Sequence, residues 1–179
     1  LVTDRAFGNA DTLATSYSIL SAASTQDKYD MIFCGKESLD GATGQMGAQL
    51  AQRFEAAQVT GTLLIKEVNE EAKTAVVERE LEDGVETLEV KLPSLFTMEK
   101  VNYPARIPNL KGKLAAKKAV ITTITADDIP GLDRGRIGDP GSPTKVPRMF
   151  PPVMPEPGII IDEGSVEASV AKLMQLIKD

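Results

Sequence analysis

Threonine and glycine residues stand where two helices are expected to begin, and both groups could hold a phosphate. Thr12 and Thr15 lie in the first turns of one expected helix. A loop from Gly35 to Ala42 leads from a short apolar strand into a second helix, which we expect to begin at Thr43. Free backbone N–H groups and the positive end of the helix dipole both attract anions at a helix N-terminus. We therefore predict that the two helix tips bind one phosphate-bearing ligand.

Each of these residues also has a structural explanation. Thr12 and Thr15 could simply cap their helix. Asp40 precedes a glycine and could be a turn residue, or it could bind a ribose hydroxyl or tether the loop backbone. Gly47 could approach a ligand or permit close helix packing. What favours a binding site is that the second helix start follows the very next strand.

Several kinds of catalytic chemistry are excluded because the required side chains are missing. The chain has no histidine, no tryptophan and one cysteine, Cys34. It therefore contains no histidine-based triad and no histidine-bound zinc, and one cysteine cannot build an iron–sulfur or cysteine–zinc site. Cys34 is expected to be a small apolar filler rather than a reactive thiolate, although its backbone could line an adenine pocket. Any redox chemistry would need a bound organic cofactor.

Composition narrows the class of protein further. The 179 residues include 42% hydrophobic and 26% charged residues, which suggests one globular domain with or without an appendage. A net charge of −6 argues against a nucleic-acid surface. We find no apolar run long enough to span a membrane and no signal peptide. One cysteine fits a reducing compartment, so we expect a cytoplasmic protein.

The apolar patterns predict an α/β protein built on a parallel sheet. The sequence begins with what looks like the end of a strand, so we expect the N-terminal part of the sheet to be missing. Residues 73–81 and 85–92 alternate around a Glu-Asp-Gly turn and predict an added β-hairpin. The other expected elements are helices over 9–26 and 43–54, and strands over 30–34, 59–67 and 95–98.

The second half of the chain changes character. Pro104 and Pro108 interrupt residues 102–113, which we expect to form no regular element, before a short helix over 114–118 and a β-like segment over 120–125. Eight of the eleven prolines lie between residues 130 and 158, which predicts an extended arm without a core of its own. A final helix capped by Ser165 would need a surface to dock on. We expect domains at 1–129 and 130–179.

A basic cluster stands out in this acidic chain. It consists of Lys111, Lys113, Lys117 and Lys118 and is usually explained as a solvated face. The alternative is a docking spot for an acidic partner, with Leu110 as an exposed apolar anchor. Leu110 could equally fold inward.

Three motifs in the same order resemble those of the β subunits of electron-transfer flavoproteins. The first runs from Asp4-Arg-Ala-Phe to Asp11-Thr-Leu-Ala-Thr-Ser16, and the second from Cys34-Gly-Lys to Asp40-Gly-Ala-Thr43-Gly-Gln45-Met-Gly47. The third is Asn102-Tyr-Pro with Arg106-Ile-Pro-Asn-Leu110 and the lysines that follow. The similarity extends over nearly the whole chain.

The resemblance implies a heterodimer with an α subunit that carries FAD. It implies AMP in the β pocket of ordinary members, and in the electron-bifurcating branch a second FAD that takes hydride from NADH. The first motif resembles the bifurcating version. A partner acyl-CoA-type dehydrogenase would dock on residues 102–113, with Arg106, Ile107, Leu110, Lys111 and Lys113 as contacts. The candidate nucleotide-binding residues are Asp11, Thr12, Thr15, Phe33, Cys34, Gly35, Asp40, Gly41, Thr43, Gly44 and Gln45.

The sequence departs from the family pattern in places, and other functions stay open. Ala42 stands where an acid is common, Gly44 where a larger residue is usual, and Ala105 looks like an insertion, so that Ile107 could be the anchor in place of Leu110. One alternative is an electron carrier with AMP as a structural ligand. Another is a nucleotide-binding sensor without redox function.

Overall fold

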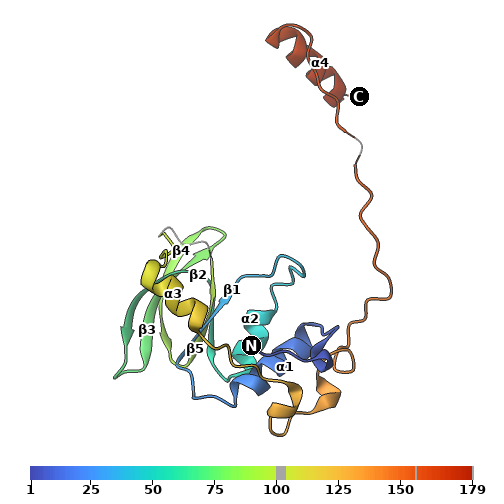
Figure 1. Ribbon diagram of the computed structural model, residues 1–179. Coiled ribbons are helices and arrows are strands. Elements are labelled where there is room, and N and C mark those ends of the chain that lie inside the picture. The colour runs from blue at the N-terminus through green and yellow to red at the C-terminus, as the bar shows by residue number, and fades with distance from the viewer. Residues whose placement is uncertain (100–103, 156, 179) are drawn as a thin grey trace. The chain divides into compact units, whose positions relative to one another are not determined.

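The computed structural model describes residues 1–99, 104–155 and 157–178. It separates into two compact units, Leu1–Lys145 and Val146–Asp179. The first unit contains a sheet and the helices packed on it, and the second consists of extended chain and a terminal helix (Figure 1). The first unit thus continues past residue 129, where we expected the domain to end.

The first unit is built on a five-stranded sheet with the order β1-β5-β2-β3-β4. Neighbours β1, β5 and β2 are parallel, and β2, β3 and β4 are antiparallel, so the hairpin extends a parallel sheet as predicted (Figure 1). The strands are β1 (Met31–Gly35), β2 (Ala57–Asn69), β3 (Thr74–Leu81), β4 (Gly84–Lys91) and β5 (Ser94–Met98). The α/β fold predicted from the apolar pattern is confirmed.

The core lies on both faces of β5. Leu95 and Phe96 are fully buried, and as successive strand residues they point to opposite faces. Leu95 packs with Leu50 and Ala51 of a helix, whereas Phe96 packs with strand residues such as Val59 and Val77. Strand β5 therefore packs against helix α2 on one face and against residues of the neighbouring strands on the other.

Helices α1 (Thr12–Ala23) and α2 (Met46–Arg53) lie side by side, and α2 packs on strands β2 and β5 of the sheet (Figure 1). Both begin later than expected. Asn9 has a φ of 56°, and Ala42 and Gly44 have φ values of 46° and 62°. Because these left-handed conformations are not helical, neither helix can include the residues that we expected at its start.

Helix α3 (Leu110–Lys118) corrects two expectations about residues 102–118. Asn109 caps it by accepting a 2.8 Å hydrogen bond from the Gly112 N–H, so the helix begins four residues before the expected Leu114. Pro108 lies just before the cap and therefore breaks no helical hydrogen bond. Residues 102 and 103 lie outside the described part of the chain. The expected β segment over 120–125 is also wrong, since only Ile124 forms a bridge, with Val2.

The beginning of the proline-rich segment packs onto the first unit rather than extending away from it. Two short 3-10 helices form there, Ala126–Asp128 and Arg134–Arg136. Ile129 follows the first and Ile137 follows the second, and both are buried. Gly138 lies so close to a third such helix, Arg5–Phe7, that a Cβ atom would overlap the Ala6 carbonyl oxygen. Residues 126–145 and the chain before α1 are therefore packed together.

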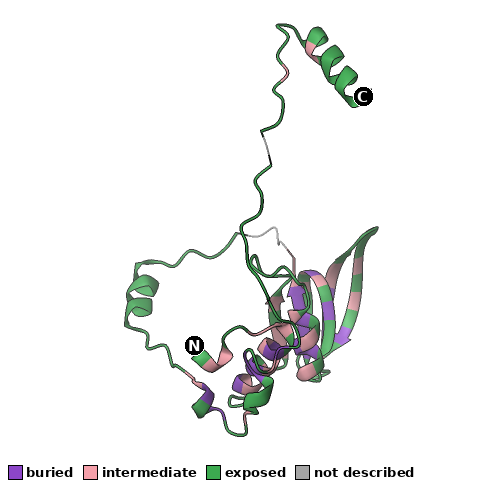
Figure 2. Cartoon of the chain, turned by 90° about the vertical axis from the view of Figure 1, so that its right-hand side faces the viewer, coloured by how far each residue is buried: buried purple, intermediate pink, exposed green. Residues whose placement is uncertain are grey.

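The second unit ends in α4 (Val166–Lys178), as the sequence predicts. The Ser165 hydroxyl accepts a 3.2 Å hydrogen bond from the Ala168 N–H and caps the helix. Val166, Val170, Leu173 and Ile177 follow helical spacing and are largely exposed (Figure 2). Within the described residues, the apolar side of α4 has no buried residue.

Candidate nucleotide-binding site

The loop of residues 36–45 follows the carboxyl end of β1 and leads into α2, as the sequence predicts. Because β1 and β5 are parallel, their carboxyl ends meet at one edge of the sheet. Lys36 follows β1 and forms a 2.9 Å ion pair with Glu99, which follows β5. The hydrogen bond to Glu99 and its charge raise the pKa of Lys36. This ion pair fixes the beginning of the loop at the edge where ligands of open α/β sheets bind.

The beginnings of α1 and α2 are joined by side-chain hydrogen bonds. The Thr12 hydroxyl donates to Gln45 Oε1 over 2.9 Å and accepts from Gln49 Nε2 over 3.1 Å. One turn further along, the buried Ser16 hydroxyl donates to Gln49 Oε1 over 3.0 Å. The two helix tips therefore lie next to each other, which is the arrangement that a shared ligand requires.

The tip of α2 is open. Gln45, its N-cap residue, makes no capping hydrogen bond through its side chain. Among the described residues, the N–H groups of Met46, Gly47 and Ala48 have no hydrogen-bond acceptor. An open first turn of this kind offers several donors and a positive dipole end to an anion.

The tip of α1 is closed by its own cap. The two carboxylate oxygens of Asp11 accept hydrogen bonds from the Ala14 N–H at 3.0 Å and the Thr144 N–H at 3.1 Å. Burial alone would raise the pKa of Asp11, but these backbone donors outweigh it and lower the pKa. Asp11 thus acts as a helix cap, and Thr12, the first residue of α1, contacts the start of α2.

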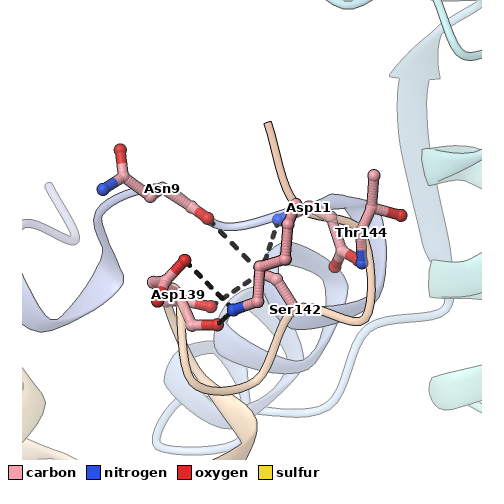
Figure 3. A network of polar contacts seen from close by, with 7 residues as sticks. Asn9, Asp11, Asp139, Ser142 and Thr144 are labelled. Carbon is pink, nitrogen blue, oxygen red and sulfur yellow. Dashed lines mark hydrogen bonds and ion pairs between the residues drawn. The ribbon is translucent and has the colours of Figure 1, made fainter. Parts of the chain in front are cut away.

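Ser142, which belongs to the proline-rich segment, holds the start of α1 in place. Its buried hydroxyl accepts a 2.8 Å hydrogen bond from the Asp11 N–H and donates to the Gly138 carbonyl oxygen over 2.7 Å. Figure 3 shows Thr144 to the right of Asp11 and Ser142 below it, with Asn9 and Asp139 to the left. Residues more than 130 positions apart in the sequence therefore set the start of α1.

The loop itself is exposed and is shaped by Asp40. The Asp40 carboxylate accepts a 2.9 Å hydrogen bond from the Gly41 N–H. The Ser38 hydroxyl, followed by this backbone donor, lowers the pKa of Asp40. Asp40 therefore tethers the loop backbone, which was one of the roles expected for it. Gly41, Thr43 and Gly44 are exposed beside it, and Thr15 is half-buried on α1.

The strand residues of the predicted site are arranged along β1. Phe33 is 54% exposed and stacks on Phe96 with ring centroids 5.5 Å apart. Cys34 is half-buried, and burial raises the pKa of its thiol, which keeps it protonated at neutral pH. Gly35 ends the strand and is exposed. Burial thus disfavours the thiolate form of Cys34.

Sequence reasoning missed several residues that build this site. Gln49 links the two helices, Ser142 orders the cap of α1, and Lys36 and Glu99 join two strand ends. A lysine directly after the strand was a visible signal for Lys36. Nothing in the local sequence indicates the partners of Gln49 or Ser142, because each contacts residues more than 30 positions away.

Comparison with known proteins identifies the family. The family described as "Electron transfer flavoprotein domain" matches residues 1–129. The electron transfer flavoprotein subunit beta of Thermoanaerobacterium thermosaccharolyticum is 40% identical over 177 residues, which cover 98% of this chain and 65% of the relative. The chain belongs to the electron transfer flavoprotein family, and it is of the β-subunit type. The resemblance carried by the three motifs is thereby confirmed.

Two further relatives have names that include a reductase. The caffeyl-CoA reductase-Etf complex subunit CarD of Acetobacterium woodii is 36% identical over 179 residues, covering 100% of this chain and 67% of the relative. The acryloyl-CoA reductase electron transfer subunit gamma of Anaerotignum propionicum is 36% identical over 186 residues, covering 98% of this chain and 68% of the relative. The chain spans about two thirds of the length of these curated relatives.

Membership of the family favours an electron-transfer protein over the alternative of a nucleotide-binding sensor. Among the helices described, none is both long enough and apolar enough to cross a membrane.

Proposed function

We propose that this electron transfer flavoprotein chain binds FAD at the joined tips of α1 and α2 and passes electrons to an FAD in its α subunit. The observation that carries the proposal is the open first turn of α2, held beside α1 by Thr12 and Gln45. A dinucleotide carries its negative charge on a diphosphate, which is the group that free N–H donors at a helix tip bind best.

The residues at this site fit such a ligand. The N–H groups of Met46, Gly47 and Ala48 are the donors for the diphosphate, and the exposed Gly41 and Gly44 leave the loop backbone free of bulky side chains. The half-buried Cys34 lies on the face of β1 that packs against α2, whereas the exposed ring of Phe33 lies on the opposite face, against Phe96. When bound, the flavin supplies the hydride and electron chemistry, which no side chain of this chain provides.

The finer proposal is that NADH is the electron donor and that the electron pair is split between two acceptors. It is supported by the Asp4-Arg-Ala-Phe version of the first motif and by the relatives named as parts of caffeyl-CoA and acryloyl-CoA reductases. The acceptor would be a flavin-dependent dehydrogenase of the acyl-CoA type. An AMP in the β site, serving only as a structural ligand, is the competing proposal.

The acceptor would dock on the exposed segment that ends in α3. Leu110 is 74% exposed and Ile107 is 86% exposed, so both are available as apolar anchors. Arg106, Lys111 and Lys113 are exposed beside them and would speed the encounter with an acidic surface. No residue of α3 is buried, which leaves the whole helix free for a partner.

The test is the nucleotide content of the purified heterodimer. Two FAD molecules per heterodimer, bleached by NADH, support the proposal, whereas one FAD and one AMP support the structural-ligand alternative. The double variant with Thr12→Val and Thr15→Val should lose the β-site nucleotide and keep the α-site FAD. Thr25→Val at the other end of α1 is the matched control and should keep both. Full β-site occupancy in the double variant contradicts the placement of the site.

A further inference from the structure

A second pocket lies away from the nucleotide loop, at the far end of α2. It has a volume of about 290 Å³ and is bounded by α1, by the end of α2 and by the backbone of residues 140–143. Its polar lining residues are Tyr17 from α1, Arg53 from α2, Arg136 from a 3-10 helix and Ser142 from the segment that follows. Arg53 is the last residue of α2, whereas Gln45 precedes the first, so the two sites use opposite ends of one helix.

The two arginines are held in place around one aromatic ring. Arg53 donates from Nε to the Ser16 hydroxyl over 2.8 Å and from a terminal nitrogen to the Leu13 carbonyl oxygen over 3.0 Å. The guanidinium carbons of Arg136 and Arg53 lie 4.0 and 5.7 Å from the centroid of the Tyr17 ring. The Tyr17 hydroxyl accepts a 3.1 Å hydrogen bond from the backbone of the neighbouring loop, which fixes the ring.

Neither arginine has an acidic partner among the described residues. Arg134, on the same 3-10 helix as Arg136, does have one, because it pairs with Asp127 at 2.5 Å. Burial and then the charge of Arg136 lower the pKa of Arg53. The fold therefore keeps two positive charges close together without neutralising them, in a chain with a net charge of −6.

We propose that the Arg53–Arg136 pocket binds an oxyanion, the carboxylate or phosphate group of a ligand. An anion between the guanidinium groups removes their mutual repulsion and accepts their free N–H donors. Arginine is suited to this because its planar fork donates two parallel hydrogen bonds to a carboxylate or phosphate. The hydrogen bonds of Arg53 to Ser16 and Leu13 orient the fork before the ligand arrives, which lowers the entropic cost of binding.

The anion can come from two sources: a free small molecule, or an acidic side chain of the α subunit. The first experiment uses the full chain alone and titrates it with inorganic phosphate at constant ionic strength, balanced with sodium chloride. The readout is the NMR signal of the Arg53 and Arg136 side-chain N–H groups. Phosphate should shift both signals along a saturating curve. Absence of a saturating shift overturns the proposal.

The matched variants are Arg136→Gln and Arg134→Gln, which remove the same charge from one 3-10 helix. Arg136→Gln should weaken phosphate binding at the Arg53 signal by about tenfold or more, because it removes charge-assisted hydrogen bonds. Arg134→Gln should leave the affinity within about twofold, since its charge is already paired. Equal effects of the two variants contradict the proposal. Arg136→Lys, which keeps the charge and loses the fork, serves if Arg136→Gln does not fold.

The heterodimer separates the two sources. If an α-subunit carboxylate fills the pocket, phosphate no longer shifts the arginine signals in the complex, and Arg136→Gln weakens subunit association. If the ligand is free, the phosphate curve is the same in the complex and in the chain alone. Both results are compatible with the oxyanion site, and neither depends on which nucleotide fills the loop at α2.

Discussion

Replacing Gly47 by alanine should displace the start of α2 and with it the nucleotide site. Gly47 is buried in the first turn of α2, against β5. A Cβ atom there would overlap the Cγ2 methyl group of Thr97 and touch Leu95 Cδ2 at 3.6 Å. Thr97 is itself buried, and its hydroxyl accepts a 3.3 Å hydrogen bond from the Gly61 N–H, so it cannot turn away freely.

Two opposing effects set the size of the change. Overpacking a well-filled core costs about 1–3 kcal/mol. Alanine is a better helix former than glycine by up to about 1 kcal/mol. We therefore expect Gly47→Ala to lower the free energy of unfolding by about 1–2 kcal/mol. The overlap is removed by Thr97→Ser, which deletes the obstructing methyl group and keeps the hydroxyl.

A double-mutant cycle tests this reasoning. Thr97→Ser alone should cost about 1 kcal/mol for the lost methyl group, and the double variant should be close to the wild type, because one methyl group replaces another. The coupling free energy should thus be about 2–3 kcal/mol in magnitude, within the range for residues in contact. Urea unfolding of the full chain, followed by circular dichroism, measures all four variants.

The matched control is Gly112→Ala in the exposed helix α3. Its Cβ atom would meet nothing closer than 3.4 Å, so it should leave stability unchanged or raise it slightly. A Gly47→Ala variant as stable as the wild type, or a coupling free energy near zero, would refute the packing argument. Since α2 positions Gln45 beside Thr12, the same variant should also lower the nucleotide content of the heterodimer.

Three further predictions follow from the structure. Asp11→Ala should lower the free energy of unfolding by about 1–2 kcal/mol in urea titrations, and Asp11→Asn by less, because asparagine keeps the cap acceptor; equal losses would argue against capping. The lowered pKa values of Asp4 and Asp11 stabilise the fold above their ordinary value of 3.8. This stabilisation should be lost as the pH falls through the lowered pKa values. The urea midpoint, measured between about pH 5 and pH 2, should therefore decline, and the decline should be smaller in Asp11→Asn than in the wild type. Leu110→Ala should slow electron transfer to the acceptor dehydrogenase without changing the urea midpoint, because Leu110 is exposed; an unchanged rate would remove it as the anchor.

The local sequence was enough for elements with a strong internal pattern. The alternating segments of the hairpin and the apolar run of β1 each carry their own periodicity, so β3, β4 and β1 lie where the sequence predicts them. The Ser165 cap and the apolar spacing after it likewise predicted α4. The helix starts were less accurate, because Asn9 and Ala42 adopt positive φ values, which asparagine tolerates but alanine rarely adopts.

What only the tertiary structure decided is which groups at the site are free to bind a ligand. The sequence placed threonines at both helix starts, but it could not show that Asp11, Ser142 and Thr144 close one tip while the other stays open. Nor could it bring Arg136 to Arg53, more than 80 positions away. Hydrogen bonds and charge repulsion depend on distance in space, which a linear pattern does not contain. The sequence by itself determined that this chain carries the motifs of its family, and the folded chain determined where its unsatisfied donors and charges lie.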